Sequence, residues 1–223
     1  MRRYLQALSV RTEFAVVIIG AFGLLIAASL VAVIRPAARA PMSDAYLASV
    51  LGYELMVMAV LLPFLRVRGW SFKRIGLRVT AVDTLIGFAL ALANLLTFYM
   101  GYALVASLWP RAALAMSMPG FFSQNLSLSA VIAVSIVNPI FEETFVCGYV
   151  ISVLKERFDA WTGINVSVAI RLLYHLYQGA VATINVVPTG LILGIWYART
   201  GRLWPVIVAH ALWDFLPLLY YVR

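Results

Sequence analysis

The sequence predicts an all-α protein: a polytopic bundle of about seven to eight transmembrane helices that forms one membrane domain over residues 1–223. Two observations predict this class. The chain is 64% apolar and only 12% charged, whereas a soluble domain has about half apolar and about a quarter charged residues. In addition, apolar runs long enough to cross about 30 Å of hydrocarbon recur along the whole chain.

Seven runs are expected to span the membrane. The first follows three arginines, and it is too long for the core of a signal peptide, so we interpret it as a membrane anchor. Gln178 and Gly179 mark the expected break between the fifth and sixth runs. The seven predicted spans are 13–34, 45–65, 82–109, 128–154, 164–179, 182–198 and 203–221.

The distribution of basic residues predicts the orientation. If the N-terminus is cytoplasmic, the loops on that side carry twelve of the 17 Lys and Arg residues, and the opposite loops carry Arg35, Arg39, Arg111 and Arg223. This agrees with the positive-inside rule. We therefore expect an integral protein of a bacterial plasma membrane with a cytoplasmic N-terminus. Membrane lipids are expected partners and nucleic acid is not, while the oligomeric state stays open. The basic segment 66–80 is expected to lie on the membrane surface or to form an ordinary cytoplasmic loop.

Ionisable residues inside the predicted spans are candidates for a functional site, because a charge in hydrocarbon is costly. Counted from the cytoplasmic ends, Glu142, His175 and Asp214 lie at nearly one depth on three different helices. This predicts one shared site. The full set is Glu54, Glu142, Glu143, Arg171, His175, His210 and Asp214.

The spacing of these residues refines the prediction. His210 and Asp214 are four residues apart and share a helix face, and so do Arg171 and His175. Glu143 shares a face with Cys147, whereas the preceding Glu142 points about 100° away, so the two glutamates need not have the same role. Pro139 lies one turn before the glutamates and removes a backbone hydrogen bond, which can open the helix locally.

Hydrolysis is the chemistry that such residues can perform. A carboxylate can take a proton from water, and imidazole or amide donors can stabilise an oxyanion. No cofactor is expected on this interpretation. The alternative is a divalent metal such as zinc, held by Glu142, His175 and His210. The sequence has no HExxH motif, and its single cysteine excludes a site of paired thiolates.

Three segments together resemble the CPBP family, the intramembrane proteases related to type II CAAX prenyl endopeptidases and to bacteriocin-processing and self-immunity proteins. The segment "EETFVCGY" resembles the family motif EExxxR. The segment "RLLYHLYQG" matches the second motif, an aromatic residue upstream of a histidine. The segment "LWPVIVAHALWD" matches the third motif, a histidine followed four residues later by Asn or Asp. The resemblance covers about residues 138–215, and we expect a CPBP-like catalytic core at about 128–221.

The resemblance implies a helix bundle with a cavity open to the cytosolic side, and cleavage of peptide bonds near a membrane-anchored C-terminus. It assigns Glu142 as the general base and His175 as its partner. It places His210 and Asp214 at the oxyanion-stabilising positions, with Glu143 as a supporting carboxylate.

The sequence departs from the family pattern at two positions. Cys147 stands where the motif has arginine, and we expect it to be a packing residue. Our hypothesis is that Arg171 supplies the missing charge from the next helix. Asp214 stands where asparagine is frequent; because an ionised aspartate repels an oxyanion, it must be protonated, bound to a metal or a support for His210.

These features favour an intramembrane endopeptidase that cleaves membrane-associated substrates, whether lipidated or leader-bearing. A catalytically impaired CPBP-like binding or immunity protein is an alternative, because the motif arginine is missing. A small proton-coupled transporter is a third reading, since buried Glu and His residues also occur in transporters. No inverted repeat of the kind common in transporters is evident.

Overall fold

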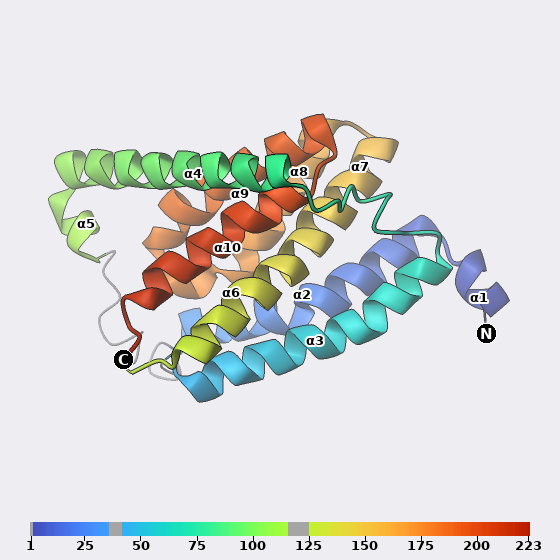
Figure 1. The fold of residues 1–223 in the computed structure, drawn as a ribbon, viewed down its shortest axis with the longest axis horizontal. Coiled ribbons are helices and arrows are strands. Elements are labelled where there is room, and N and C mark those ends of the chain that lie inside the picture. Colours follow the sequence, from blue (N-terminus) through green and yellow to red (C-terminus); the bar gives the residue numbers. More distant parts are fainter. Residues whose placement is uncertain (1, 36–41, 116–124) are drawn as a thin grey trace.

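The computed structural model describes residues 2–35, 42–115 and 125–223, and these residues fold into a bundle of helices (Figure 1). The long helices start at residues that cap exposed backbone N–H groups: the side chain of each of Ser9, Ser43, Thr80, Ser127 and Asp159 accepts a hydrogen bond from the N–H three residues later. The elements are α1 (Arg2–Ala7), α2 (Val10–Ile34), α3 (Asp44–Val67), α4 (Ala81–Leu108), α5 (Pro110–Ala115), α6 (Leu128–Glu143), the π-helical segment η2 (Thr144–Ile151), α7 (Ser152–Arg157), α8 (Ala160–Tyr174), the 3₁₀ turn η3 (Leu176–Gln178), α9 (Ala180–Thr200) and α10 (Trp204–Leu219).

The predicted polytopic bundle is confirmed. Within the described residues, five helical stretches are long and apolar enough to cross a membrane: α2, α3, α4, the continuous stretch 128–157 and α9. The spans predicted at 164–179 and 203–221 are shorter helices, α8 with 15 residues and α10 with 16. At 1.5 Å per residue each covers roughly 22–24 Å, less than the hydrocarbon core. Helix α8 ends early because the chain turns at His175 and then adopts a positive φ of 66° at Gly179.

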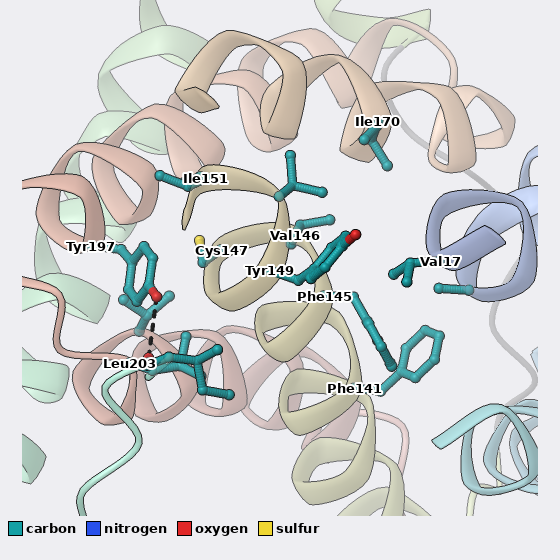
Figure 2. Close-up of a cluster of buried hydrophobic side chains, with 14 of the residues drawn as sticks. Val17, Phe141, Phe145, Val146, Cys147, Tyr149, Ile151, Ile170, Tyr197 and Leu203 are labelled. Carbon is teal, nitrogen blue, oxygen red and sulfur yellow. Dashed lines mark hydrogen bonds between the residues drawn. The ribbon is translucent and has the colours of Figure 1, made fainter. Parts of the chain in front are cut away.

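The stretch formed by α6 and η2 runs through the middle of the bundle (Figure 1). Helices α3 and α10 pack on α6, α8 and α9 pack on η2, α4 packs on α10, and α2 packs on α8. Every side chain from 141 to 151 is buried. Figure 2 shows Phe141 and Phe145 extending toward Val17, while Cys147 lies on the side of the segment nearer Tyr197 and Leu203. The exposed face of α4, by contrast, is apolar, as expected for contact with lipid: Leu85, Phe88, Leu92, Leu96 and Tyr99.

Helices α4 and α10 approach closely at Gly87. A Cβ atom at this position would lie 2.5 Å from Cβ of Val208 and 3.0 Å from the carbonyl oxygen of Pro205. Only glycine therefore permits the observed separation, as is common where membrane helices pack against one another. This contact places α10, which carries His210 and Asp214, against the outer helix.

Contacts between loops define the two ends of the bundle. At one end Arg68 donates to the carbonyls of Leu5, Gln6 and Leu8, Arg74 pairs with Glu156, and the N–H of Leu203 donates to the carbonyl of Gly76. We call this the basic end; it comprises residues 2–13, 66–80, 155–159 and 199–203. At the other end, which we call the distal end, residues 42–44, 109–111, 125–127 and 220–223 lie at the opposite tips of the helices (Figure 1). There Ser127 donates to Asp44, and Leu126 pairs with Val222.

The segment 66–80 forms part of the basic end and does not lie on the membrane surface through its tryptophan. Trp70 is buried, and its Nε1 donates to Glu13 at 2.8 Å. The guanidinium of Arg74 lies 3.9 Å from the centre of the same ring. Trp70 therefore faces the interior of the protein, whereas Phe72 of the same segment is exposed.

Candidate active site

The two glutamates lie at a change of helix type. Pro139 within α6 cannot donate a backbone hydrogen bond, and the α-helix gives way to η2 directly after Glu143. Segments of π-helix are rare and often occur at functional sites. The hydrogen bond that Pro139 cannot donate would reach the carbonyl of Ser135, and α6 stays α-helical through this region. The π-helical segment begins only after the glutamates.

Glu143 is held by basic side chains from two other helices. Its Oε2 lies 2.5 Å from Nη2 of Arg171 on α8, and its Oε1 lies 2.6 Å from Nδ1 of His210 on α10. The same Nη2 of Arg171 is 3.5 Å from Sγ of Cys147. All of these side chains are buried. Arg171 thus contacts both Glu143 and the position where the motif has arginine, which is the proximity that the sequence predicted.

Glu142 has a different set of partners. Tyr174 donates to its Oε2 at 2.5 Å, and Asn138 donates to its Oε1 at 3.2 Å. The nearest cationic groups are Nη1 of Arg171 at 3.8 Å and Nε2 of His210 at 4.0 Å. The two glutamates thus differ in their contacts: Glu143 has close contacts with two basic side chains, whereas the same side chains lie farther from Glu142.

Asn138 also binds the buried carboxylate of Glu54 on α3. Its Nδ2 lies 2.6 Å from Oε1 of Glu54, so that one amide group joins two carboxylates. Asn138 is thus the partner of Glu54, and Oε2 of Glu54 has no hydrogen bond within the described residues.

His175 lies just beyond the last turn of α8. Its Nδ1 is 2.9 Å from the carbonyl oxygen of Arg171. Because a carbonyl only accepts, Nδ1 must carry the proton, and a neutral ring then has its lone pair on Nε2. His175 lines the same cavity as Glu142, but its ring nitrogens make no direct bond to Glu142.

Asp214 lies one turn after His210 on α10. Its Oδ1 is 3.5 Å from Nε2 of His210, and its side chain is 24% exposed. Both nitrogens of His210 therefore face carboxylates, Glu143 on one side and Asp214 on the other, which suits a ring with two N–H donors. Of the three roles considered for Asp214, the geometry favours support of His210.

The cavity beside these residues has a volume of about 260 Å³. Its polar wall comes from α6, α8, α9 and α10 and from the turn after α8. Apolar side chains from the first turns of α3 and the last turn of α10 continue the wall, including Leu47 and Leu218. The polar lining consists of Asn138, Glu142, Arg171, His175, Gln178, Asn185, Thr189, His210 and Asp214.

The side chains considered for zinc are partly engaged with other groups. Among residues 2–35, 42–115 and 125–223, no three His, Cys, Asp or Glu side chains are grouped to hold a metal ion. Glu142 accepts a hydrogen bond from Tyr174, and Nδ1 of His210 contacts Glu143, whereas His175 uses only Nδ1 and keeps the lone pair of Nε2. Arg171 close to both glutamates adds a positive charge where a cation would bind.

The comparison with known families agrees with this geometry. Residues 124–216 match the family model described as type II CAAX prenyl endopeptidase Rce1-like. Over these residues the chain is similar to this family. The predicted resemblance to CPBP intramembrane proteases is thereby confirmed, and the Rce1-like region contains every residue of the cluster except Glu54. Together with the five long apolar helices, it makes the chain an integral membrane protein with a protease-type core. Comparisons with curated proteins and with solved structures found no match.

Two residues of the Rce1-like site were not predicted from the sequence. Asn138 and Tyr174 both donate to Glu142, but an amide and a phenol attract less notice in an apolar run than a charge does. Their positions in the sequence could have indicated them, because Asn138 precedes Glu142 by one helical turn and Tyr174 is the aromatic residue next to His175. The ring of Phe22 stacks on Tyr174 with centroids 5.1 Å apart, which restricts the orientation of this phenol.

Proposed function

We propose that the protein is a glutamate-dependent intramembrane endopeptidase that hydrolyses peptide bonds of membrane-associated substrates. The observation that carries the proposal is the carboxylate of Glu142, which lines a cavity next to His175, His210 and Arg171 and is oriented by two neutral donors. The match to the Rce1-like endopeptidases supports the reaction class.

In the proposed reaction Glu142 takes a proton from a water molecule, and the water oxygen attacks the carbonyl carbon of the scissile bond. The C–N bond then breaks, and the proton held by Glu142 passes to the leaving amine. The hydrogen bonds from Tyr174 and Asn138 support this role because they fix the carboxylate without neutralising it by a close ion pair. His175, with its lone pair on Nε2, is the partner that orients the water.

His210 is proposed to stabilise the oxyanion through Nε2–H. Glu143 holds the opposite side of the ring through Nδ1, and Asp214 at 3.5 Å supports the N–H that faces the cavity. A donor fixed in this way before the reaction costs no reorganisation in the transition state. In this assignment Asp214 acts through His210 and does not contact the oxyanion, so its negative charge is tolerated.

Arg171 is proposed to replace the arginine of the family motif. Its guanidinium lies against Glu143 and Cys147, so the charge that the motif supplies from position 147 comes from α8. This favours a working enzyme over the catalytically impaired relative that the missing arginine suggested. Asn138 and Tyr174 around Glu142 also fit a fixed general base better than the carboxylate relay of a transporter.

The remaining features of the proposal follow from the sequence. The protein lies in a bacterial plasma membrane with its N-terminus in the cytoplasm, contacts membrane lipids, needs no cofactor and does not bind nucleic acid. Its substrates are membrane-associated peptides or proteins, lipidated or leader-bearing.

Cleavage by the purified protein tests this function. The protein in detergent is incubated with a panel of lipidated and leader-bearing peptides, and products are identified by mass spectrometry. We expect cleavage of at least one class by the wild type and none by Glu142→Ala. Cleavage that is retained in Glu142→Ala would contradict the assignment of the base, and binding without cleavage in both proteins would favour the impaired relative.

A further inference from the structure

We infer that helix α9 binds the main chain of the substrate, with Asn185 and Thr189 as the polar contacts, and that the bound segment is extended. The inference deepens the proposed function, on which it rests for the identity of the ligand as a peptide. It assigns a role to a part of the polar wall that the proposed reaction leaves unused.

One face of α9 lines the cavity. Val181, Asn185 and Thr189 are all lining residues, and because they recur every four positions they form one row along the helix. Thr189 stands at the end of this row that is near the catalytic cluster. The residue after it, Gly190, packs so closely on α8 that a Cβ there would lie 3.3 Å from Cδ of Arg171. The row therefore starts beside Arg171 and leads away from it.

The amide of Asn185 is not used by the protein itself. Its Oδ1 is buried and makes no hydrogen bond within the described residues, whereas buried polar atoms in native proteins are nearly always bonded to protein or to water. Gln178, in the turn before α9, also lines the cavity with an oxygen that has no partner there. Because no bond fixes the amide of Asn185, it can turn its oxygen or its nitrogen toward the cavity. It can therefore bind either side of a peptide group, the N–H or the carbonyl.

The spacing of the two polar residues fits an extended peptide. Asn185 and Thr189 are four residues apart, which is about 6 Å along the axis of a helix. In an extended strand, N–H groups that point the same way recur every two residues, about 6.6–6.8 Å apart. The two side chains can therefore engage alternate residues of one extended segment. A helical segment satisfies its own backbone groups and offers none to α9, so the substrate must be unwound where it meets this helix.

The other walls of the cavity complement this row. Glu142 lines the same cavity, so a segment held on α9 lies beside the general base. Apolar side chains complete the lining, among them Val50 on α3, Val134 on α6 and Pro217 on α10. They can contact the side chains of a peptide but cannot bond its main chain. Contacts from α9 would therefore fix the position of the scissile bond without selecting a particular sequence.

Peptide binding to a protein that cannot turn over tests the inference apart from catalysis. The Glu142→Gln protein in detergent is titrated with each fluorescently labelled peptide of the lipidated and leader-bearing panel, and affinity is measured by fluorescence anisotropy. The titrations are repeated with Asn185→Leu or Thr189→Val added, since each change removes the polar group and keeps a similar size. Asn94→Leu and Thr183→Val are the matched controls: Asn94 is buried without a hydrogen bond in the described structure and does not line the cavity, and Thr183 is exposed on α9.

We expect Asn185→Leu and Thr189→Val each to weaken peptide binding roughly 2–12-fold, the effect of one neutral hydrogen bond, and both controls to leave it unchanged. The unfolding midpoint of Asn185→Leu should not fall, because the change removes a polar group that has no partner. In the active protein the loss should appear in KM and not in kcat. Peptides in which single amides are replaced by esters identify the contact: an ester at the bound position should weaken binding to the Glu142→Gln protein, but not further once Asn185→Leu is present.

Unchanged affinity and KM in Asn185→Leu, or an equal loss in Asn94→Leu, would overturn the inference, because the amide would then contact only water. Failure of every peptide to bind the Glu142→Gln protein would also overturn it. Binding that depends on Asn185, without cleavage by the wild type, would support the inference and contradict the proposed protease function. Cleavage with a KM that is insensitive to both changes on α9 would do the reverse.

Discussion

Arg171 on α8 forms an ion pair with Glu143 on α6, with 2.5 Å between Nη2 and Oε2, and the same nitrogen lies 3.5 Å from Sγ of Cys147. The family motif provides an arginine four residues after the second glutamate, and here that position holds cysteine. The guanidinium of Arg171 contacts the side chain at that position, and it comes from a different helix. Small Cys147 leaves the room that the guanidinium of Arg171 fills.

This relationship predicts that Arg171→Ala damages both folding and activity. The change leaves the buried carboxylate of Glu143 without one of its two cationic partners, and breaking a buried pair in this way costs about 3–5 kcal/mol. We expect a lower midpoint of thermal unfolding in detergent and loss of peptide cleavage. Arg171→Lys is the matched variant; it keeps the charge but not the planar group that reaches Glu143 and Cys147 together, so we expect an intermediate effect.

A second change separates charge replacement from a general packing defect. Arginine restored at the motif position, in the double variant Cys147→Arg with Arg171→Ala, should recover part of the stability and cleavage lost in Arg171→Ala. If Arg171→Ala keeps wild-type stability and cleavage, and the double variant gains neither, Arg171 does not replace the arginine of the motif.

Asn138 joins two carboxylates, and its removal is expected to destabilise the site. In Asn138→Ala, Glu54 and Glu142 each lose a donor, and a buried polar group left without a partner costs about 1–3 kcal/mol. We expect reduced thermal stability and a lower kcat, because Glu142 loses part of its orientation. Asn94→Ala is the control: Asn94 is buried, but neither side-chain atom has a hydrogen bond within the described structure. Equal losses of kcat in both variants would show that Asn138 has no special role.

The close approach of α4 and α10 predicts a strong effect of a single methyl group. In Gly87→Ala the added Cβ would meet Val208 at 2.5 Å, and overpacking of this kind costs about 1–3 kcal/mol. Gly52→Ala is the matched control, since a Cβ there meets no atom within 4 Å. We expect the unfolding midpoint to fall for Gly87→Ala and to stay or rise for Gly52→Ala, because alanine favours helix. Unchanged stability of Gly87→Ala would contradict the observed helix separation.

Removal of divalent metal ions is expected to leave cleavage intact. Oε2 of Glu142 accepts a hydrogen bond from Tyr174, and the guanidinium of Arg171 lies 3.8 Å from the same oxygen, so that a cation at Glu142 would meet a positive charge. Cleavage should therefore proceed at the same rate after treatment with a chelator. Loss of cleavage with a chelator and its recovery on addition of zinc would show that the side chains rearrange around a metal.

Much of the fold follows from the sequence, because bilayer thickness fixes the length of an apolar helix. The spans predicted at 13–34 and 45–65 correspond to α2 and α3, and caps such as Ser43 explain the exact starts. The end of α8 was not predictable in this way. The sequence from 164 to 179 is apolar enough to continue, but the chain turns at His175 to present residues to the cavity, which depends on tertiary contacts.

The charged residues of the candidate site could be predicted from the sequence, whereas its neutral hydrogen-bond donors could not. Glu142, Arg171 and His210 are conspicuous because each is costly in hydrocarbon. Asn138 and Tyr174 both donate hydrogen bonds to Glu142 in the structure, yet these side chains occur in many apolar helices without a special role. The π-helical form of η2 also depends on packing around the helix, and no residue of "TFVCGYVI" encodes it alone.

The most direct test of the account compares two near-isosteric changes in one assay. Glu142 and Glu54 are both buried carboxylates bound to Asn138, but only Glu142 lines the cavity. A general base contributes about 10²–10⁴-fold to rate. Glu142→Gln should therefore lower kcat by at least about 10²-fold with the protein still folded, while Glu54→Gln should retain most of the activity. Wild-type kcat in Glu142→Gln, or an equal loss in both variants, would contradict the assignment of Glu142 as the base.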